Sequence, residues 1–169
     1  SKGSVIFQNE LFQLIHYEPL SKKCYSVPLL IIPPWINKFY ILDLKRENSF
    51  IQFCLKKNLS VFVISWVNPG TEHKNVSFED YIDNGLLKAS DVVKRYCKQD
   101  QINTIGYCIG GTLLASTLAY LSKKNIKFIK SSTFFTTLTD FEDPGDLSIF
   151  VTDEYPVSYT HLTLPTTGS

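Results

Sequence analysis

Short apolar runs alternate with segments of helical spacing along this chain. The apolar runs are residues 29–32, 61–66, 102–107 and 128–135. The first, Leu29-Leu30-Ile31-Ile32, has no polar position and ends at Pro33-Pro34, which is typical of a strand buried on both faces. Helical spacing is found over residues 48–58, 77–97 and 113–121. Strands that alternate with helices in this way predict a parallel α/β sheet with right-handed crossovers.

The predicted helix over 77–97 also has a start signal. Ser77 stands where an N-cap is expected, and Asp80 follows at a position similar to the acidic residue of a capping box. The chain has 169 residues, of which 44% are hydrophobic, so it can build a real core. The sequence thus favours an ordered domain of ordinary size, or a piece of a larger one.

Charge and hydropathy exclude several classes of partner. Lys and Arg number 17 against 16 Asp and Glu, so the formal net charge is +1. This near-neutral balance argues against nucleic acid or an anionic membrane surface as the partner. No apolar run approaches the ~18 residues of a membrane span, and no signal peptide is seen. We therefore expect a cytoplasmic protein without a transmembrane segment, whose first residue, a Ser, is not the natural start.

The cysteines and histidines do not form a metal-binding pattern. Cys24, Cys54, Cys97 and Cys108 include no CxxC pair and no zinc-ligand spacing, and the three histidines are scattered. The sequence predicts free thiols and no metal site.

The strongest chemical signal is the segment 106–111, Gly-Tyr-Cys-Ile-Gly-Gly. It directly follows a predicted strand and precedes a helix, which is the context of the nucleophile elbow G-x-S-x-G, with Cys108 in place of Ser. The fold class predicted is therefore an α/β-hydrolase fold. In such an elbow the backbone N–H of Ile109 points at the oxyanion that forms during acyl transfer. The alternative is a glycine-rich turn that carries a buried cysteine.

An acyl-transfer site needs a second oxyanion donor, which in this fold comes from the loop after an earlier strand. Residues 33–38 occupy that place, and Trp35, Ile36 and Asn37 are the candidates for contact with substrate. The alternative is a proline-stiffened loop that only covers the end of the sheet.

The general base and its acid are not found with the nucleophile. In α/β-hydrolases the chain order is nucleophile, acid, histidine, and His161 is the only histidine after Cys108. It lies in a Thr- and Pro-containing segment without the strand and helix that would place a triad histidine. Asp140 follows the last predicted strand, where we prefer a turn or capping carboxylate. His16 and His73 precede the nucleophile and are expected at the surface.

At these residues the chain resembles the polyhydroxyalkanoate synthases (poly-3-hydroxybutyrate polymerases), and among them the single-subunit kind that uses short-chain monomers. The matching stretches are 9–15 (NELFQLI), 33–44 (PPWINKFYILDL), 63–69 (VISWVNP), 78–81 (FEDY), 106–112 (GYCIGGT) and 134–141 (FFTTLTDF). The resemblance implies an acyltransferase in which Cys108 attacks a 3-hydroxyacyl-coenzyme A, releases coenzyme A and passes the acyl unit to a growing polyester. It implies no metal or organic cofactor, a possible homodimer, and attachment to the surface of polymer granules.

The resemblance ends near residue 155, and the family carries its triad acid and histidine further downstream. We expect residues 1–27 to lead into the catalytic domain, 28–155 to form a partial α/β-hydrolase domain that lacks its C-terminal part, and 156–169 to be a non-native tail. We expect this fragment to be inactive alone. Two alternatives stay open: a Cys-dependent hydrolase of small esters, lactones or thioesters, and an inactive truncated product.

Overall fold

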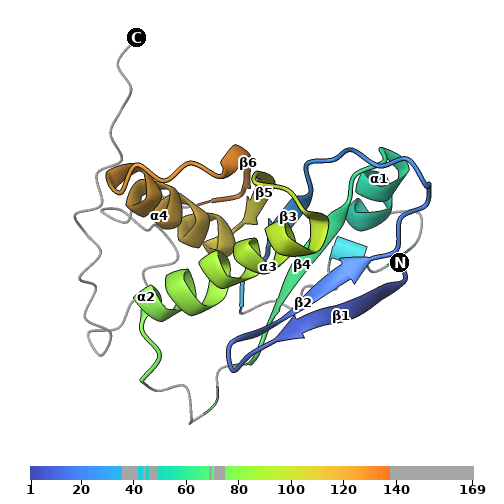
Figure 1. Cartoon of the computed structure of the whole chain (residues 1–169). Helices are drawn as coiled ribbons and strands as arrows, with labels where there is room; N and C mark the ends of the chain where they lie inside the picture. The colour runs from blue at the N-terminus through green and yellow to red at the C-terminus, as the bar shows by residue number, and fades with distance from the viewer. Residues whose placement is uncertain (36–41, 44, 46–48, 69, 71–74, 138–169) are drawn as a thin grey trace.

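The structure is a computed structural model that describes residues 1–35, 42–43, 45, 49–68, 70 and 75–137. The described strands form one sheet in the order β1-β2-β4-β3-β5-β6 (Figure 1). The strands are β1 (Gly3–Gln8), β2 (Phe12–Tyr17), β3 (Leu29–Ile32), β4 (Val61–Trp66), β5 (Ile102–Tyr107) and β6 (Ile129–Phe135). The helices are α1 (Phe50–Lys56), α2 (Phe78–Asp80), the π-helix η4 (Tyr81–Leu87), α3 (Lys88–Cys97) and α4 (Ile109–Lys123).

The strands β4, β3, β5 and β6 run parallel, as the apolar runs predicted. In the centre, Ile31 of β3 pairs with Val63 on one side and with Ile105 on the other. All four residues of β3 are buried, because both faces of the sheet are covered there. β3 therefore lies between β4 and β5, and the ends of these strands are brought together at one edge of the sheet.

An antiparallel hairpin at the start of the chain extends the sheet, and the sequence analysis assigned no strands to it. β1 pairs with β2, and β2 pairs antiparallel with β4, with Phe12 opposite Trp66 and His16 opposite Phe62. β1 is largely exposed because it is the edge strand, so it lacks a clear apolar pattern. The sheet is consequently mixed rather than purely parallel.

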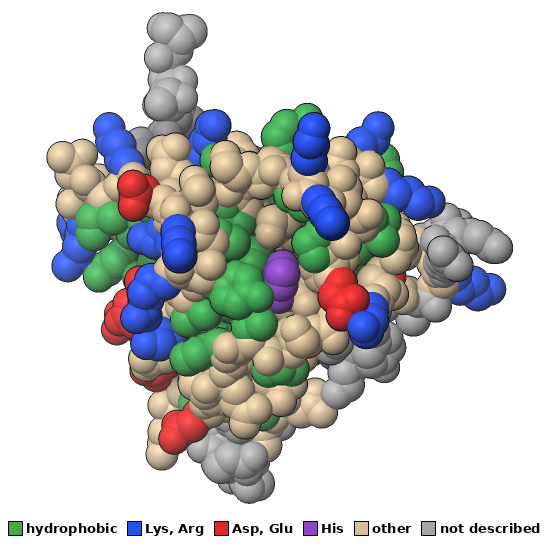
Figure 2. Space-filling view, turned by 45° about the vertical axis from the view of Figure 1, so that its right-hand side comes forward, with side chains coloured by type: hydrophobic (Ala, Val, Ile, Leu, Met, Phe, Trp, Pro, Cys, Tyr) green, Lys and Arg blue, Asp and Glu red, His purple; other side chains and the backbone are tan. Residues whose placement is uncertain are grey.

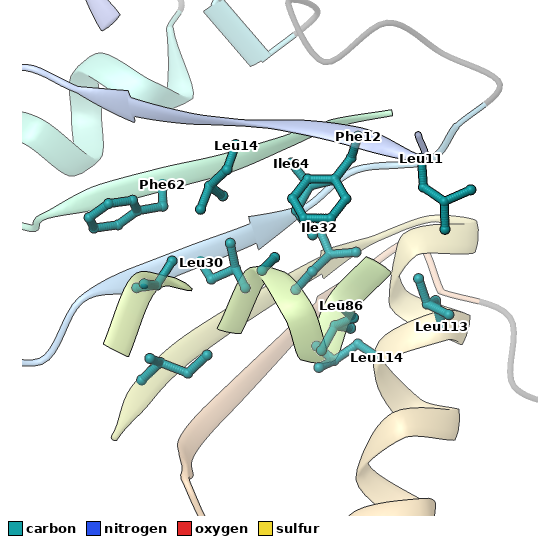
Figure 3. Close-up of a cluster of buried hydrophobic side chains, with 13 residues drawn as sticks. Leu11, Phe12, Leu14, Leu30, Ile32, Phe62, Ile64, Leu86, Leu113 and Leu114 are labelled. Carbon is teal, nitrogen blue, oxygen red and sulfur yellow. The ribbon is translucent and has the colours of Figure 1, made fainter. Parts of the chain in front are cut away.

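Two hydrophobic clusters cover opposite faces of the sheet. On one face, alternate residues of β2, β3 and β4 pack against η4, α3 and α4, and Figure 3 shows these side chains pointing toward one another. The labelled members are Leu11, Phe12, Leu14, Leu30, Ile32, Phe62, Ile64, Leu86, Leu113 and Leu114. On the other face, Leu29, Ile31 and Val63 pack against α1 through Cys54 and Leu55. The period-2 alternation of each strand thus fills both layers.

The sequence predicted the cap at Ser77, but it did not predict the π-helix that follows or the residue at which α4 begins. Ser77 and Asp80 form the predicted capping box. The helical segment that follows is π-helical over η4, where Gly85 lies against the Trp66 ring. α4 begins at Ile109, earlier than the predicted residue 113, because Gly110 and Gly111 are poor helix formers that hid its first turn. Within the described ranges, no helix is both long enough and apolar enough to cross a bilayer.

Candidate active site

Cys108 occupies a sharp turn between β5 and α4. Its φ of 54° and ψ of −126° lie outside the regions that non-glycine residues ordinarily adopt. Lys98, in contrast, has a φ of 52° and a ψ of 46°, which is the common left-handed conformation at a helix end. The Cys108 N–H donates to the Phe135 carbonyl at 2.9 Å, and the Cys108 carbonyl accepts from Gly111 at 2.9 Å. Strain of this kind, fixed by hydrogen bonds on both sides, is typical of a functional turn.

Three glycines allow the strand, the turn and the helix to pack this closely. A Cβ at Gly106 would lie 2.5 Å from the Cα of Gly111. A Cβ at Gly110 would lie 2.2 Å from the Ile32 carbonyl oxygen and 2.7 Å from that of Pro33. A Cβ at Gly111 would lie 2.0 Å from the Thr137 hydroxyl. The helix α4 therefore begins directly against the end of β3, and the spacing of glycines around Cys108 has a steric cause.

Ile109 is the first residue of α4, where backbone N–H groups have no partner within the helix. The N–H groups of Gly111 and Thr112 donate to the Cys108 carbonyl. The Ile109 N–H lies beside the nucleophile at the positive end of the helix dipole, which is suitable for an oxyanion donor. The position of Ile109 is compatible with the role predicted for it.

The loop after β3 lies against this elbow through the contact of its first residues with Gly110. Of the three candidates in this loop, Trp35 is described, whereas Ile36 and Asn37 lie outside the described residues. The half-buried Trp35 ring stacks on Tyr81 at 4.8 Å with an interplanar angle of 16°. It also meets the Trp66 ring edge-on at 6.0 Å. The structure therefore places Trp35 near the elbow, in an aromatic cluster.

We refer to Phe12, Trp35, Trp66 and Tyr81 as the Trp66 cluster, because the Trp66 ring contacts the other three. The Trp66 indole N–H donates to the Pro33 carbonyl at 2.7 Å. Burial raises the pKa of Tyr81. The sequence analysis did not single out Trp66 or Tyr81 as site residues, although both fall in stretches that resemble the family.

His16 is the histidine that the described residues contain, and it is not near Cys108. It lies at the end of β2 that pairs with Phe62, whereas the other end of β2 pairs with Trp66. Its ring stacks on Phe62 at 4.5 Å and meets Tyr96 at 5.2 Å, and Figure 2 shows a histidine among hydrophobic side chains at the surface. Asp140, His73 and His161 lie outside the described residues. The structure therefore does not identify a base for Cys108.

The remaining cysteines differ from Cys108 in their surroundings. All four cysteines are free thiols, as predicted. Cys54 is buried on α1, and burial raises its pKa to about 11. Burial also raises the pKa of Cys97. A raised pKa keeps a thiol neutral, and a neutral thiol is a poor nucleophile, so the buried Cys54 and the half-buried Cys97 are suited to packing rather than chemistry. Among the described residues, no group of three or more His, Cys, Asp and Glu side chains could hold a metal ion.

The sequence of this chain is similar to those of one group of enzymes. Residues 1–54 match the family model described as "Poly-beta-hydroxybutyrate polymerase (PhaC) N-terminus". The chain is 47% identical over 152 residues to the poly(3-hydroxyalkanoate) polymerase subunit PhaC of Rhizobium etli, and 41% identical over 164 residues to that of Cupriavidus necator. These matches cover 90% and 97% of the chain. The chain is a homologue of the poly(3-hydroxyalkanoate) polymerases.

The match to these polymerases confirms the resemblance seen in the sequence, but it covers only part of each relative. The chain spans 24% of the length of the Rhizobium etli polymerase and 28% of that of Cupriavidus necator. The activity, substrates and partners of a whole polymerase are therefore matters for proposal.

Solved structures show the fold independently of the polymerases. The virulence factor BioJ of Francisella has a TM-score of 0.63 at 15% identity, over 86% of this chain and 46% of its own. An esterase from Rhizomucor miehei has a TM-score of 0.60 at 14% identity, over 91% of this chain and 49% of its own. The fold is thus a partial α/β-hydrolase fold, as the elbow predicted.

Proposed function

We propose that this chain forms part of a poly(3-hydroxyalkanoate) polymerase and supplies its nucleophile, Cys108. The observation that carries the proposal is the backbone of Cys108, which has the strained geometry of a nucleophile elbow in a chain 41–47% identical to polymerases. A glycine-rich turn with a merely structural cysteine does not require this conformation.

The reaction that we propose has two acyl transfers. A base takes the Cys108 proton, the sulfur attacks the thioester carbon of a 3-hydroxyacyl-coenzyme A, and the bond to the coenzyme A sulfur breaks. Coenzyme A leaves with that proton, and the acyl group stays on Cys108. The hydroxyl of a second 3-hydroxyacyl unit then attacks this new thioester. The ester bond forms as the bond between the acyl carbon and the Cys108 sulfur breaks, and the hydroxyl proton returns through the base to the Cys108 thiolate, so the chain grows by one unit.

Cysteine suits this chemistry because both the substrate and the acyl-enzyme are thioesters of similar energy. The two backbone donors of the oxyanion hole, Ile109 and one from the loop that includes Trp35, Ile36 and Asn37, would stabilise each tetrahedral intermediate. The proposal needs no metal or organic cofactor. The base and its acid would come from parts of the polymerase outside the described residues, and we expect the 169-residue chain alone to be inactive. A homodimer, a cytoplasmic location and attachment to polymer granules stay predictions.

The decisive experiment compares the complete gene product with its Cys108→Ala variant, using 3-hydroxybutyryl-coenzyme A. We expect the unaltered protein to release coenzyme A, to form polyester and to carry an acyl group on Cys108 by mass spectrometry. Cys108→Ala should lose all three, by at least about 10³-fold in rate, because the substitution removes the thiol that the strained turn presents. Polymer formation that survives the substitution would exclude Cys108 as the nucleophile. Coenzyme A release without polymer would instead favour a Cys-dependent hydrolase.

A further inference from the structure

Trp66 makes two kinds of contact, one through its ring and one through its indole N–H. Its ring is half-buried and touches Phe12, Trp35 and Tyr81. Its indole N–H donates a 2.7 Å hydrogen bond to the Pro33 carbonyl, 33 residues away in the chain. Pro33 is the first residue after β3, so this bond ties the end of β4 to the loop that lies against Gly110 of the elbow.

The same stretch of backbone is confined from the other side by the elbow. Gly110 approaches the Ile32 and Pro33 carbonyls so closely that a Cβ would fall within 2.2 Å and 2.7 Å of their oxygens. The Pro33 carbonyl is thus held between the Trp66 indole and the first turn of α4. A shift at either side moves the loop relative to Cys108.

The two prolines limit the backbone N–H groups that this part of the loop can offer to an oxyanion. Pro33 and Pro34 have no N–H, so neither can donate to an oxyanion. The first backbone N–H that follows β3 belongs to Trp35. Its ring is stacked on Tyr81, the first residue of η4, at 4.8 Å. The backbone from Pro33 to Trp35 is therefore tied at one end by a hydrogen bond and at the other by a ring stack.

We propose that Trp66 is a positioning residue, whose indole N–H holds the loop from Pro33 to Trp35 at the distance that the oxyanion hole requires. This inference rests on the proposed function, because it assigns the loop to transition-state stabilisation. Oxyanion donors act over 2.7–3.1 Å, and loss of one donor costs ~10²–10³-fold in kcat. A donor that is present but misplaced loses part of that effect. A residue that only packed would instead affect folding stability and leave the chemistry of folded molecules unchanged.

The experiment removes the indole N–H and keeps the ring. In the complete polymerase, Trp66→Phe is compared with a second variant in which an isostere replaces Trp66, with sulfur in place of the indole N–H. The isostere fills the same volume, so it tests the hydrogen bond even if Trp66→Phe folds poorly. The matched control is Tyr96→Phe, which deletes the hydroxyl 3.4 Å from His16 in the aromatic cluster at the other end of β4.

Three quantities are measured for each protein: kcat and KM for coenzyme A release from 3-hydroxybutyryl-coenzyme A, and the rate at which iodoacetamide alkylates Cys108. Alkylation displaces iodide without forming an oxyanion, so it reports the nucleophile alone. We expect both Trp66 variants to lower kcat at least about tenfold, with KM and the alkylation rate within about twofold of the unaltered enzyme. Tyr96→Phe should leave all three unchanged.

The outcomes separate this inference from the proposed function. If the unaltered polymerase releases coenzyme A and the isostere variant matches it in kcat, Trp66 does not position the loop. If alkylation falls as much as kcat, Trp66 supports the elbow as a whole and the inference is overturned. If the unaltered protein neither releases coenzyme A nor acylates Cys108, the proposed function fails and this inference fails with it.

Discussion

The two ends of β4 carry aromatic clusters that are similar in composition but differ in the groups that they contact. At the carboxyl end, the Trp66 ring contacts Phe12, Trp35 and Tyr81, and its N–H holds a backbone carbonyl beside the Cys108 elbow. At the amino end, the His16 cluster consists of His16, Phe62 and Tyr96, and the Tyr96 hydroxyl lies 3.4 Å from the His16 Nδ1, a contact between two side chains.

The difference lies in the backbone next to each cluster. The elbow near the Trp66 cluster has a strained residue and three glycines in close contact. The His16 cluster sits on the regular β2–β4 ladder, where Ile15, His16 and their partners pair in register. His16 is chemically capable of base catalysis, yet the described residues around it, Phe62 and Tyr96, pack against its ring and form no strained turn. A reactive residue type is therefore a weaker sign of a site than a backbone that is forced into an unusual conformation.

The largest effect is expected from Gly110→Ala, in the closely packed elbow near the Trp66 cluster. The added methyl would fall 2.2 Å from the Ile32 carbonyl oxygen, and the atoms that it meets are backbone and cannot rotate away. We expect a loss of about 2–3 kcal/mol in the free energy of unfolding, and at least a tenfold fall in coenzyme A release by the complete polymerase. Denaturant unfolding and steady-state kinetics measure the two.

Gly3→Ala is the matched control, since its methyl would come no closer than 3.0 Å to any atom, the nearest being the Ile15 Cγ2 methyl at 3.0 Å and the His16 carbonyl oxygen at 3.2 Å. It should change stability by less than about 1 kcal/mol and leave the rate unchanged. Equal effects of the two substitutions would show that the elbow is no more tightly packed than the edge of the sheet.

Much of this arrangement follows from local sequence, and the part that does not is long-range. The four parallel strands were predicted from apolar runs, and Cys108 from glycine spacing at a strand–helix boundary. The β1–β2 hairpin was not predicted, because β1 is a largely exposed edge strand and β2 interleaves the polar residues Gln13 and His16 with its buried ones, so β2 forms no continuous apolar run. The hydrogen bond from Trp66 to Pro33 joins residues 33 positions apart, and neither the order of strands nor the rotamer of an indole can be derived from composition or periodicity.

The next effect in size concerns the amino end of β4. Phe62 is fully buried and packs on both His16 and Tyr96. Phe62→Leu leaves a partly filled space, and we expect it to lower the free energy of unfolding by about 1–2 kcal/mol. In molecules that remain folded, the alkylation rate of Cys108 should not change, because the substituted ring lies at the other end of the strand. A slower alkylation in folded protein would show that the two ends of β4 are coupled.

The smallest effect is a pH dependence that belongs to the His16 cluster alone. Burial lowers the pKa of His16 below its ordinary value of 6.5, so the folded protein resists protonation that the unfolded chain accepts. Stability should therefore fall as the pH drops through 6.5 toward 5, where the unfolded state takes up the proton first. The effect is small, because the ring is half-exposed and solvent screens its charge.

His16→Phe keeps a ring against Phe62 and removes the titrating group, so it should flatten this part of the stability profile, whereas Tyr96→Phe should retain it. Thermal unfolding of the three proteins at closely spaced pH values between 5 and 7.5 measures the difference. If His16→Phe lost stability on acidification as steeply as the unaltered protein, the pH dependence would have to come from groups outside this cluster. The cluster at the amino end of β4 would then be distinguished from the Trp66 cluster by packing alone.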